Sequence, residues 1–228
     1  MDPNTLYILI IVMFFVSLIV QASVNSKFTR LSQVPVSTGM TGAEAAKRIL
    51  LSSGVKDVKI EHTSGRLSDH YDPSSKTLRL SDAVFYSNSI AAVSVASHEA
   101  GHALQHHENY GPLMLRTSSV FMANFGSRLS WPIFFLGLLL GFPLLVNVGI
   151  ALYVLIVLFT LITLPVEFNA SSRALNLMTA NGVIRENERH DAESMLSAAA
   201  KTYVVSAVSA ILQLLRLIAI AQRGKRRD

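Results

Sequence analysis

The sequence contains no cysteine and few charged residues. Among its 228 residues, Asp, Glu, Lys and Arg together make up 15%, against about 25% in ordinary soluble domains. The missing cysteine excludes a disulfide framework, a thiolate zinc site and a cysteine nucleophile. The low charge goes with 50% hydrophobic residues and a mean hydropathy of +0.41. This balance disfavours a protein surrounded entirely by water, and the length leaves room for a small domain with membrane helices.

Two long stretches carry no charge. Segment 6–22 is uncharged over 17 residues, near the lower limit for crossing a hydrocarbon core of about 30 Å. We expect an N-terminal membrane anchor there. A cleaved signal peptide is the alternative, because Val20-Gln21-Ala22 has the form of a cleavage site, but no Lys or Arg precedes the apolar run. Segment 131–165 is uncharged over 35 residues and is divided by Gly141-Phe142-Pro143, which predicts a transmembrane helical hairpin over 120–165.

A third apolar segment, 202–222, is interrupted by Gln213 and Arg216. It predicts a C-terminal helix that spans the membrane, lies in its interface or packs on the catalytic part. The basic tail that follows, 223–228, is interpreted as a membrane-flanking anchor rather than a nucleic-acid site.

The basic residues also predict an orientation. The basic residues that flank the first span and the hairpin all fall on one side: Lys27, Arg30, Arg116, Arg128 and Arg173. The hairpin tip, 141–147, has no charge. Positive flanks favour the cytoplasmic side, so we expect a multi-pass protein with its catalytic part in the cytoplasm. The rule favours three spans with a non-spanning last helix, and four spans stay open.

The polar part of the chain, 27–118, predicts a small sheet followed by a helix. Thr41 and Glu44 have the spacing of a capping box, which predicts a helix through about Ser52. Strand patterns follow at 55–60, 67–71 and 77–80, with a turn at 72–75. We expect a small antiparallel sheet directly before a continuous helix over 82–108.

That helix carries the motif His98-Glu99-Ala100-Gly101-His102. Two histidines four residues apart lie on one helical face, where both imidazoles can bind one Zn²⁺. Glu99 then lies beside the remaining zinc position and can take a proton from water as a general base. A bare motif of this kind occurs by chance, but here small residues and strands accompany it. We expect the substrate to add as a further strand along the edge of the strand at 77–80. That strand consists of Thr77, Leu78, Arg79 and Leu80.

A catalytic zinc site needs a third protein ligand. His106 lies one turn further along the helix, but one straight helix cannot easily place three ligands around a tetrahedral ion. We therefore expect His106 to be a supporting or solvated group. Gln105 and Glu108 stand where a metzincin has Gly and His, which excludes that class. Glu167, in a helical region predicted over 166–201, places a carboxylate at the end of the apolar run. A helix-start acid is the alternative, and spacing alone leaves both open.

The reaction also needs a donor for the developing oxyanion. The candidates are Arg173, His190, Tyr203, His70 and Tyr71. For each of them taken alone, a structural role is favoured.

Several stretches together resemble the bacterial membrane zinc metallopeptidases of the YugP type. They are 41–44 (TGAE), 65–73 (GRLSDHYDP), 76–81 (KTLRLS), 96–106 (ASHEAGHALQH) and 165–171 (PVEFNAS). The resemblance implies a zinc-dependent peptidase of the bacterial inner membrane with one Zn²⁺ per chain. By similarity to the HtpX-type membrane proteases, it implies that Glu167 is the third ligand. Those enzymes have Asp four residues after that glutamate, where this chain has Ser171.

Together these observations predict an α+β membrane protein, mostly helical, with a zincin-like catalytic domain, a small antiparallel sheet and three to four membrane helices. The favoured function is a membrane-bound zinc endopeptidase that acts on peptides or membrane proteins at the bilayer. A non-catalytic membrane scaffold or chaperone with a structural zinc is the alternative. A metal transporter is disfavoured because the predicted spans carry almost no ligands. No nucleic-acid partner is expected, and the oligomeric state stays open.

Overall fold

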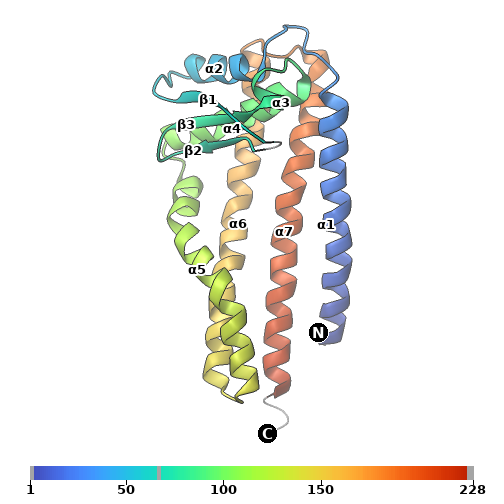
Figure 1. The fold of residues 1–228 in the computed structure, drawn as a ribbon, viewed down its shortest axis with the longest axis vertical. Coiled ribbons are helices and arrows are strands. Elements are labelled where there is room, and N and C mark those ends of the chain that lie inside the picture. The colour runs from blue at the N-terminus through green and yellow to red at the C-terminus, as the bar shows by residue number, and fades with distance from the viewer. Residues whose placement is uncertain (1–2, 66–67, 225–228) are drawn as a thin grey trace. The chain divides into compact units, whose positions relative to one another are not determined.

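A computed structural model describes residues 3–65 and 68–224, which form an α+β fold dominated by helices (Figure 1). Two sequence features extend outside the described residues: the basic tail beyond Gly224, and Arg66 and Leu67 in the predicted second strand. The elements are α1 (Pro3–Leu31), α2 (Gly42–Ser52), β1 (Lys59–Thr63), β2 (His70–Asp72), β3 (Thr77–Ser81), α3 (Asp82–Phe85), α4 (Ile90–His107), α5 (Gly111–Leu139), α6 (Pro143–Ala180), a 3₁₀ turn (Glu186–Glu188) and α7 (Arg189–Gly224).

The chain divides into two compact units. The first contains residues 20–114 and 165–201, and the second contains residues 1–19, 115–164 and 202–228. All three strands, α2, α3 and α4 belong to the first unit, which we call the sheet unit. The second, which we call the helical unit, is formed by long segments of α1, α5, α6 and α7.

Within the helical unit, α5 and α6 form the predicted hairpin. A side chain at Gly137 would lie 2.6 Å from the backbone nitrogen of Val146, and one at Gly126 would lie 2.6 Å from the carbonyl oxygen of Leu152. Glycine therefore allows the two helices to approach closely along their length. The turn between them uses Gly141 at a positive φ of 63°, where glycine is favoured. The hairpin is longer than predicted, because α5 begins at Gly111 and α6 ends at Ala180.

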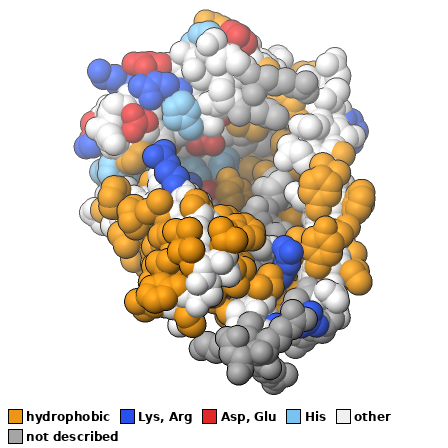
Figure 2. Space-filling view, turned by 60° about the horizontal axis from the view of Figure 1, so that its bottom comes forward, with side chains coloured by type: hydrophobic (Ala, Val, Ile, Leu, Met, Phe, Trp, Pro, Cys, Tyr) orange, Lys and Arg blue, Asp and Glu red, His pale blue; other side chains and the backbone are white. Residues whose placement is uncertain are grey.

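A buried apolar cluster joins three helices of this unit. Phe134 of α5, Val157 of α6 and Leu217 of α7 pack together in it. Other large hydrophobic side chains point outward: Ile8 and Phe14 are each 60% exposed and Leu139 is 83% exposed. Hydrophobic side chains accordingly cover much of the visible surface of the molecule (Figure 2). Exposed apolar surface of this extent is typical of contact with lipid.

Three helical segments among the described residues are long and apolar enough to cross a membrane. They are Asn4–Leu31, Pro143–Ala180 and Glu186–Arg223. The first two match the predicted anchor and the second arm of the hairpin. The third contains the C-terminal helix, for which the charge pattern favoured a non-spanning position, yet its length and composition qualify it. Helix α5 does not qualify, although the first arm of the hairpin was predicted to span.

The sheet unit contains the predicted capping box at the start of α2. Thr41 caps α2 through its side chain, and Glu44 accepts a hydrogen bond from the Thr41 backbone N–H at 2.8 Å. The apolar face of α2 packs with α4 in the core, where Ala45 and Ile49 are fully buried. The prediction of one helix over 82–108 was wrong. The chain breaks after α3, and Ser89 starts α4 anew by accepting a hydrogen bond from the Ala92 N–H.

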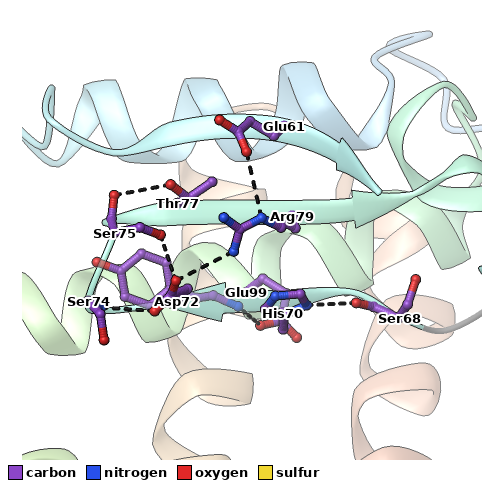
Figure 3. Close-up of polar contacts among 10 residues, drawn as sticks. Glu61, Ser68, His70, Asp72, Ser74, Ser75, Thr77, Arg79 and Glu99 are labelled. Carbon is purple, nitrogen blue, oxygen red and sulfur yellow. Dashed lines mark hydrogen bonds and ion pairs between the residues drawn. The ribbon is translucent and has the colours of Figure 1, made fainter. Parts of the chain in front are cut away.

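The sheet is mixed rather than antiparallel. Its strand order is β1-β3-β2, with β3 antiparallel to β2, as predicted for the hairpin, and parallel to β1. Arg79 of β3 contacts Glu61 of β1 and Asp72 of β2 at 3.6 and 3.5 Å, and so connects all three strands (Figure 3).

This strand order corrects the predicted substrate strand. Thr77, Leu78, Arg79 and Leu80 lie in β3, whose backbone is already paired with a neighbour on both sides. A further strand cannot add there. The edges of the sheet belong to β1 and β2.

Candidate metal centre

The two histidines of the motif meet on one face of α4. His98 and His102 are one helical turn apart, and their ring centroids lie 4.7 Å from each other. His102 is buried, with 9% of its surface exposed. The helical spacing thus produces the pair of facing imidazoles that the sequence predicted.

A close contact between α4 and α6 brings the third ligand to this pair. A side chain at Gly101 would lie 2.8 Å from the carbonyl oxygen of Ala170, so the two helix backbones touch here. The second arm of the hairpin and the helical region predicted over 166–201 join in one helix, because α6 continues through Pro165 and Glu167 to Ala180. The Glu167 Oε2 atom lies 3.3 Å from His98 Nε2 and 3.6 Å from His102 Nε2, and the residue is 2% exposed.

These three side chains fit a zinc ion. Their ligand atoms all lie within 4.8 Å of one another. Ligands about 2.0–2.2 Å from a tetrahedral ion lie roughly 3.3–3.6 Å apart, which matches the two distances between imidazole nitrogen and carboxylate oxygen. Two histidines and one glutamate are also the ligand set of a catalytic zinc site with one open position.

The motif glutamate lies between the two histidines in sequence and is held by the sheet. Glu99 Oε2 accepts a hydrogen bond from the backbone N–H of Tyr71 at 3.0 Å. Figure 3 shows Glu99 at β2, the strand that carries Tyr71. Burial raises the pKa of Glu99, while the nearby imidazoles of His102 and His98 act in the opposite direction. A carboxylate with a raised pKa in a site of this kind suits proton transfer.

Tyr71 also connects the site to the next turn of α4. Its hydroxyl lies 2.9 Å from His106 Nδ1. Burial, with the charges of Asp57 and Asp72, raises the pKa of the Tyr71 hydroxyl to about 12, so it stays protonated and can donate. His106 therefore contacts Tyr71 and is not among the grouped metal ligands, as the sequence indicated.

Each imidazole of the metal pair has a second polar partner. His98 Nδ1 lies 3.2 Å from the Ser171 hydroxyl, and His102 Nδ1 lies 3.0 Å from Gln105 Oε1. Gln105 is fully buried, and its amide nitrogen donates to Val166 O at 2.8 Å and to Asn169 Oδ1 at 2.9 Å. The sequence alone did not indicate that Gln105 and Asn169 support a metal ligand. The signal that could have identified Gln105 is an uncharged amide three residues after a predicted ligand on a buried helix.

The structure distributes the predicted oxyanion candidates over several places. Tyr71 and His70 lie on β2 beside Glu99, and His70 Nδ1 is 2.8 Å from Ser68 O. Arg173 follows Glu167 on α6, where its Nε donates to Asn169 Oδ1 at 2.8 Å and its Nη1 lies 2.6 Å from Glu108 Oε2. The remaining two are not part of the metal cluster among the described residues: His190 is exposed at the start of α7, and Tyr203 belongs to the helical unit.

Comparison with known proteins gives two matches. Residues 6–222 match the model of a family described as "Putative neutral zinc metallopeptidase". A protein of Bacillus subtilis (strain 168) named "Putative membrane protease YugP" is 49% identical over 205 residues, which cover 90% of this chain and 91% of that protein. No solved structure matches the chain.

Proposed function

Because the chain belongs to this family of zinc metallopeptidases, we propose that it is a membrane-bound, zinc-dependent endopeptidase that uses Glu99 as its general base. The observation that carries the proposal is the convergence of His98, His102 and Glu167 on one point, with the Glu99 carboxylate on the same helix. The three apolar helices and the relative named as a membrane protease support action at a membrane. The family and the ligand set support zinc, at one ion per chain.

Each residue has a definite task in this mechanism. His98, His102 and Glu167 would hold the ion, whose chemistry is to acidify water and polarise the peptide carbonyl. Glu99 accepts the proton from the attacking water and passes it to the leaving amine. The Tyr71 N–H orients the Glu99 carboxylate at 3.0 Å, and burial favours its protonated form during the transfer.

The substrate in this proposal lies along β2. This strand forms the edge of the sheet beside Glu99, and an extended peptide can add to such an edge through its backbone. The Tyr71 N–H points away from β3, because it donates to Glu99. Because Glu99 occupies this N–H, a peptide along β2 would run directly beside the general base and would pair with the outward carbonyl oxygen of the strand.

Glu99→Gln tests the proposal against a scaffold or chaperone that keeps a structural zinc. The substitution preserves shape but removes the base, so zinc should still bind while peptide hydrolysis falls by about 10²–10⁴-fold. The measurements are zinc content and cleavage of a fluorescently labelled, unfolded protein in detergent or bilayers.

Glu193→Gln is the matched control, because Glu193 is exposed on α7, and it should leave both values unchanged. A wild-type protein that binds zinc but cleaves no peptide bond would favour the scaffold. Cleavage by Glu99→Gln at the wild-type rate would remove Glu99 from the mechanism.

A further inference from the structure

Gln105 lies three residues after His102 on α4, directly beside the metal centre. It is fully buried, and each of its polar atoms has a partner in the chain. A buried amide that is satisfied in this way has a single orientation, because any rotation would leave a polar group unpaired.

The partners determine which end of the amide faces the histidine. Val166 contributes a backbone carbonyl oxygen, which can only accept, so the atom 2.8 Å from it must be the Gln105 nitrogen. The second hydrogen of that nitrogen points to Asn169 Oδ1. The Gln105 oxygen is therefore the atom that faces His102 Nδ1 at 3.0 Å.

The orientation of Asn169 is fixed in turn by a charged donor. Arg173 has only N–H donors and keeps its charge. Its Nε lies 2.8 Å from Asn169 Oδ1, which makes that atom the oxygen. Arg173 is itself held by Glu108 at 2.6 Å and lies over the Tyr110 ring at 5.9 Å.

We propose that Gln105, oriented by Asn169 and Arg173, sets the tautomer of His102 so that Nε2 is the nitrogen available to zinc. Because the Gln105 oxygen can only accept, Nδ1 carries the hydrogen, and Nε2, which faces Glu167, keeps its lone pair for the metal. Gln105 thus acts as a positioning residue between α4 and α6. Ser171 cannot impose the same choice on His98, because a hydroxyl can donate or accept. The proposal rests on the proposed function, since it assigns a role around the same metal site.

Gln105→Leu removes the acceptor from His102 without adding a charge. Loss of a supporting partner of a ligating histidine weakens metal binding by about 10–100-fold. We expect the zinc dissociation constant, measured by competition with a chelator in detergent, to rise by this factor. Circular dichroism and thermal unfolding of the zinc-free protein show whether the variant is folded.

Two substitutions at Asn169 separate positioning from simple packing. Asn169→Asp keeps an oxygen for both Gln105 and Arg173 and should bind zinc nearly as tightly as the wild type. Asn169→Leu removes that oxygen and should weaken zinc binding in the same direction as Gln105→Leu. Asn176→Leu is the control on the same helix, because Asn176 accepts from Arg189 at 3.1 Å, away from the metal ligands, and it should not change zinc affinity.

The possible results are distinct. Unchanged zinc affinity in both leucine variants at 105 and 169 would overturn the proposal, as would equal weakening by Asn169→Asp and Asn169→Leu, or weakening by Asn176→Leu. A wild-type protein that binds zinc and responds to these substitutions but cleaves no peptide bond would overturn the endopeptidase and leave the positioning role intact.

Discussion

At the scale of single residues, the site separates ligands from the groups that support them. Glu167 is the single carboxylate that α6 carries to the histidine pair, and it is nearly inaccessible to water. A charge so placed is costly unless it is paired or bound to a metal. Its position 3.3 and 3.6 Å from two imidazole nitrogens therefore favours a ligand over a helix-start acid, the alternative that spacing alone left open.

Glu167→Ala should abolish stoichiometric zinc binding, because two imidazoles on one helix leave the ion without its third protein ligand. Metal analysis of the purified variant after removal of free zinc measures the effect. Glu193→Ala, an exposed position on α7, is the control and should keep one zinc per chain. Full zinc content in a folded Glu167→Ala variant would show that Glu167 is not a required ligand.

At the scale of elements, the contact between α4 and α6 creates the centre. Gly101 lies inside the motif, and its missing side chain is what lets α4 approach the backbone at Ala170. The added carbon of an alanine would meet backbone atoms of α6, which cannot rotate away as a side chain would. The distance between the two helices then sets the distance between the imidazoles and the carboxylate.

Gly101→Ala should therefore force α4 and α6 apart. We expect a loss of stability of about 1–3 kcal/mol, typical of overpacking, together with weaker zinc binding. Denaturant unfolding in detergent micelles and chelator competition measure the two effects. Gly111→Ala is the matched control: a side chain there meets nothing within 4 Å, and alanine in a helix is more favourable by up to about 1 kcal/mol. Equal behaviour of the two variants would contradict the role given to the contact.

The contact between α4 and α6 separates the features that the sequence could predict, which are local, from those that it could not. The spacing of His98 and His102 within one helix is a local pattern, and so are the capping box at Thr41 and the β2–β3 turn. Gln105 acquires its role only through α6, which is distant in sequence. The order of the strands is equally non-local. The sequence of β3 is that of an ordinary strand, yet β3 also pairs with β1, which precedes the β2–β3 hairpin in the chain. The assignment of Glu167 needed the family resemblance for this reason.

At the scale of the whole molecule, the connectivity constrains the path through a membrane. The sheet unit contains residues from before and after segment 115–164, and α6 within that segment is apolar enough to cross. One crossing would place the two parts of the sheet unit on opposite faces of the bilayer. If α6 crosses, these two parts can form one compact unit on one face only when α5 crosses as well, so we predict that both arms of the hairpin span the membrane. This prediction rests on connectivity, because the composition of α5 alone does not qualify it as a span.

The absence of cysteine makes the orientation directly measurable, because any introduced cysteine is unique. We expect the sheet unit on the cytoplasmic side, since Lys27, Arg30 and Arg116 flank the spans there and the hairpin tip is uncharged. In intact bacterial cells, a membrane-impermeant maleimide should label Phe142→Cys at the tip but label Ser53→Cys, exposed after α2, only after permeabilisation. Labelling of both in intact cells would contradict the double crossing of α5 and α6. Labelling of Ser53→Cys alone would reverse the orientation and place Glu99, the proposed general base, outside the cell.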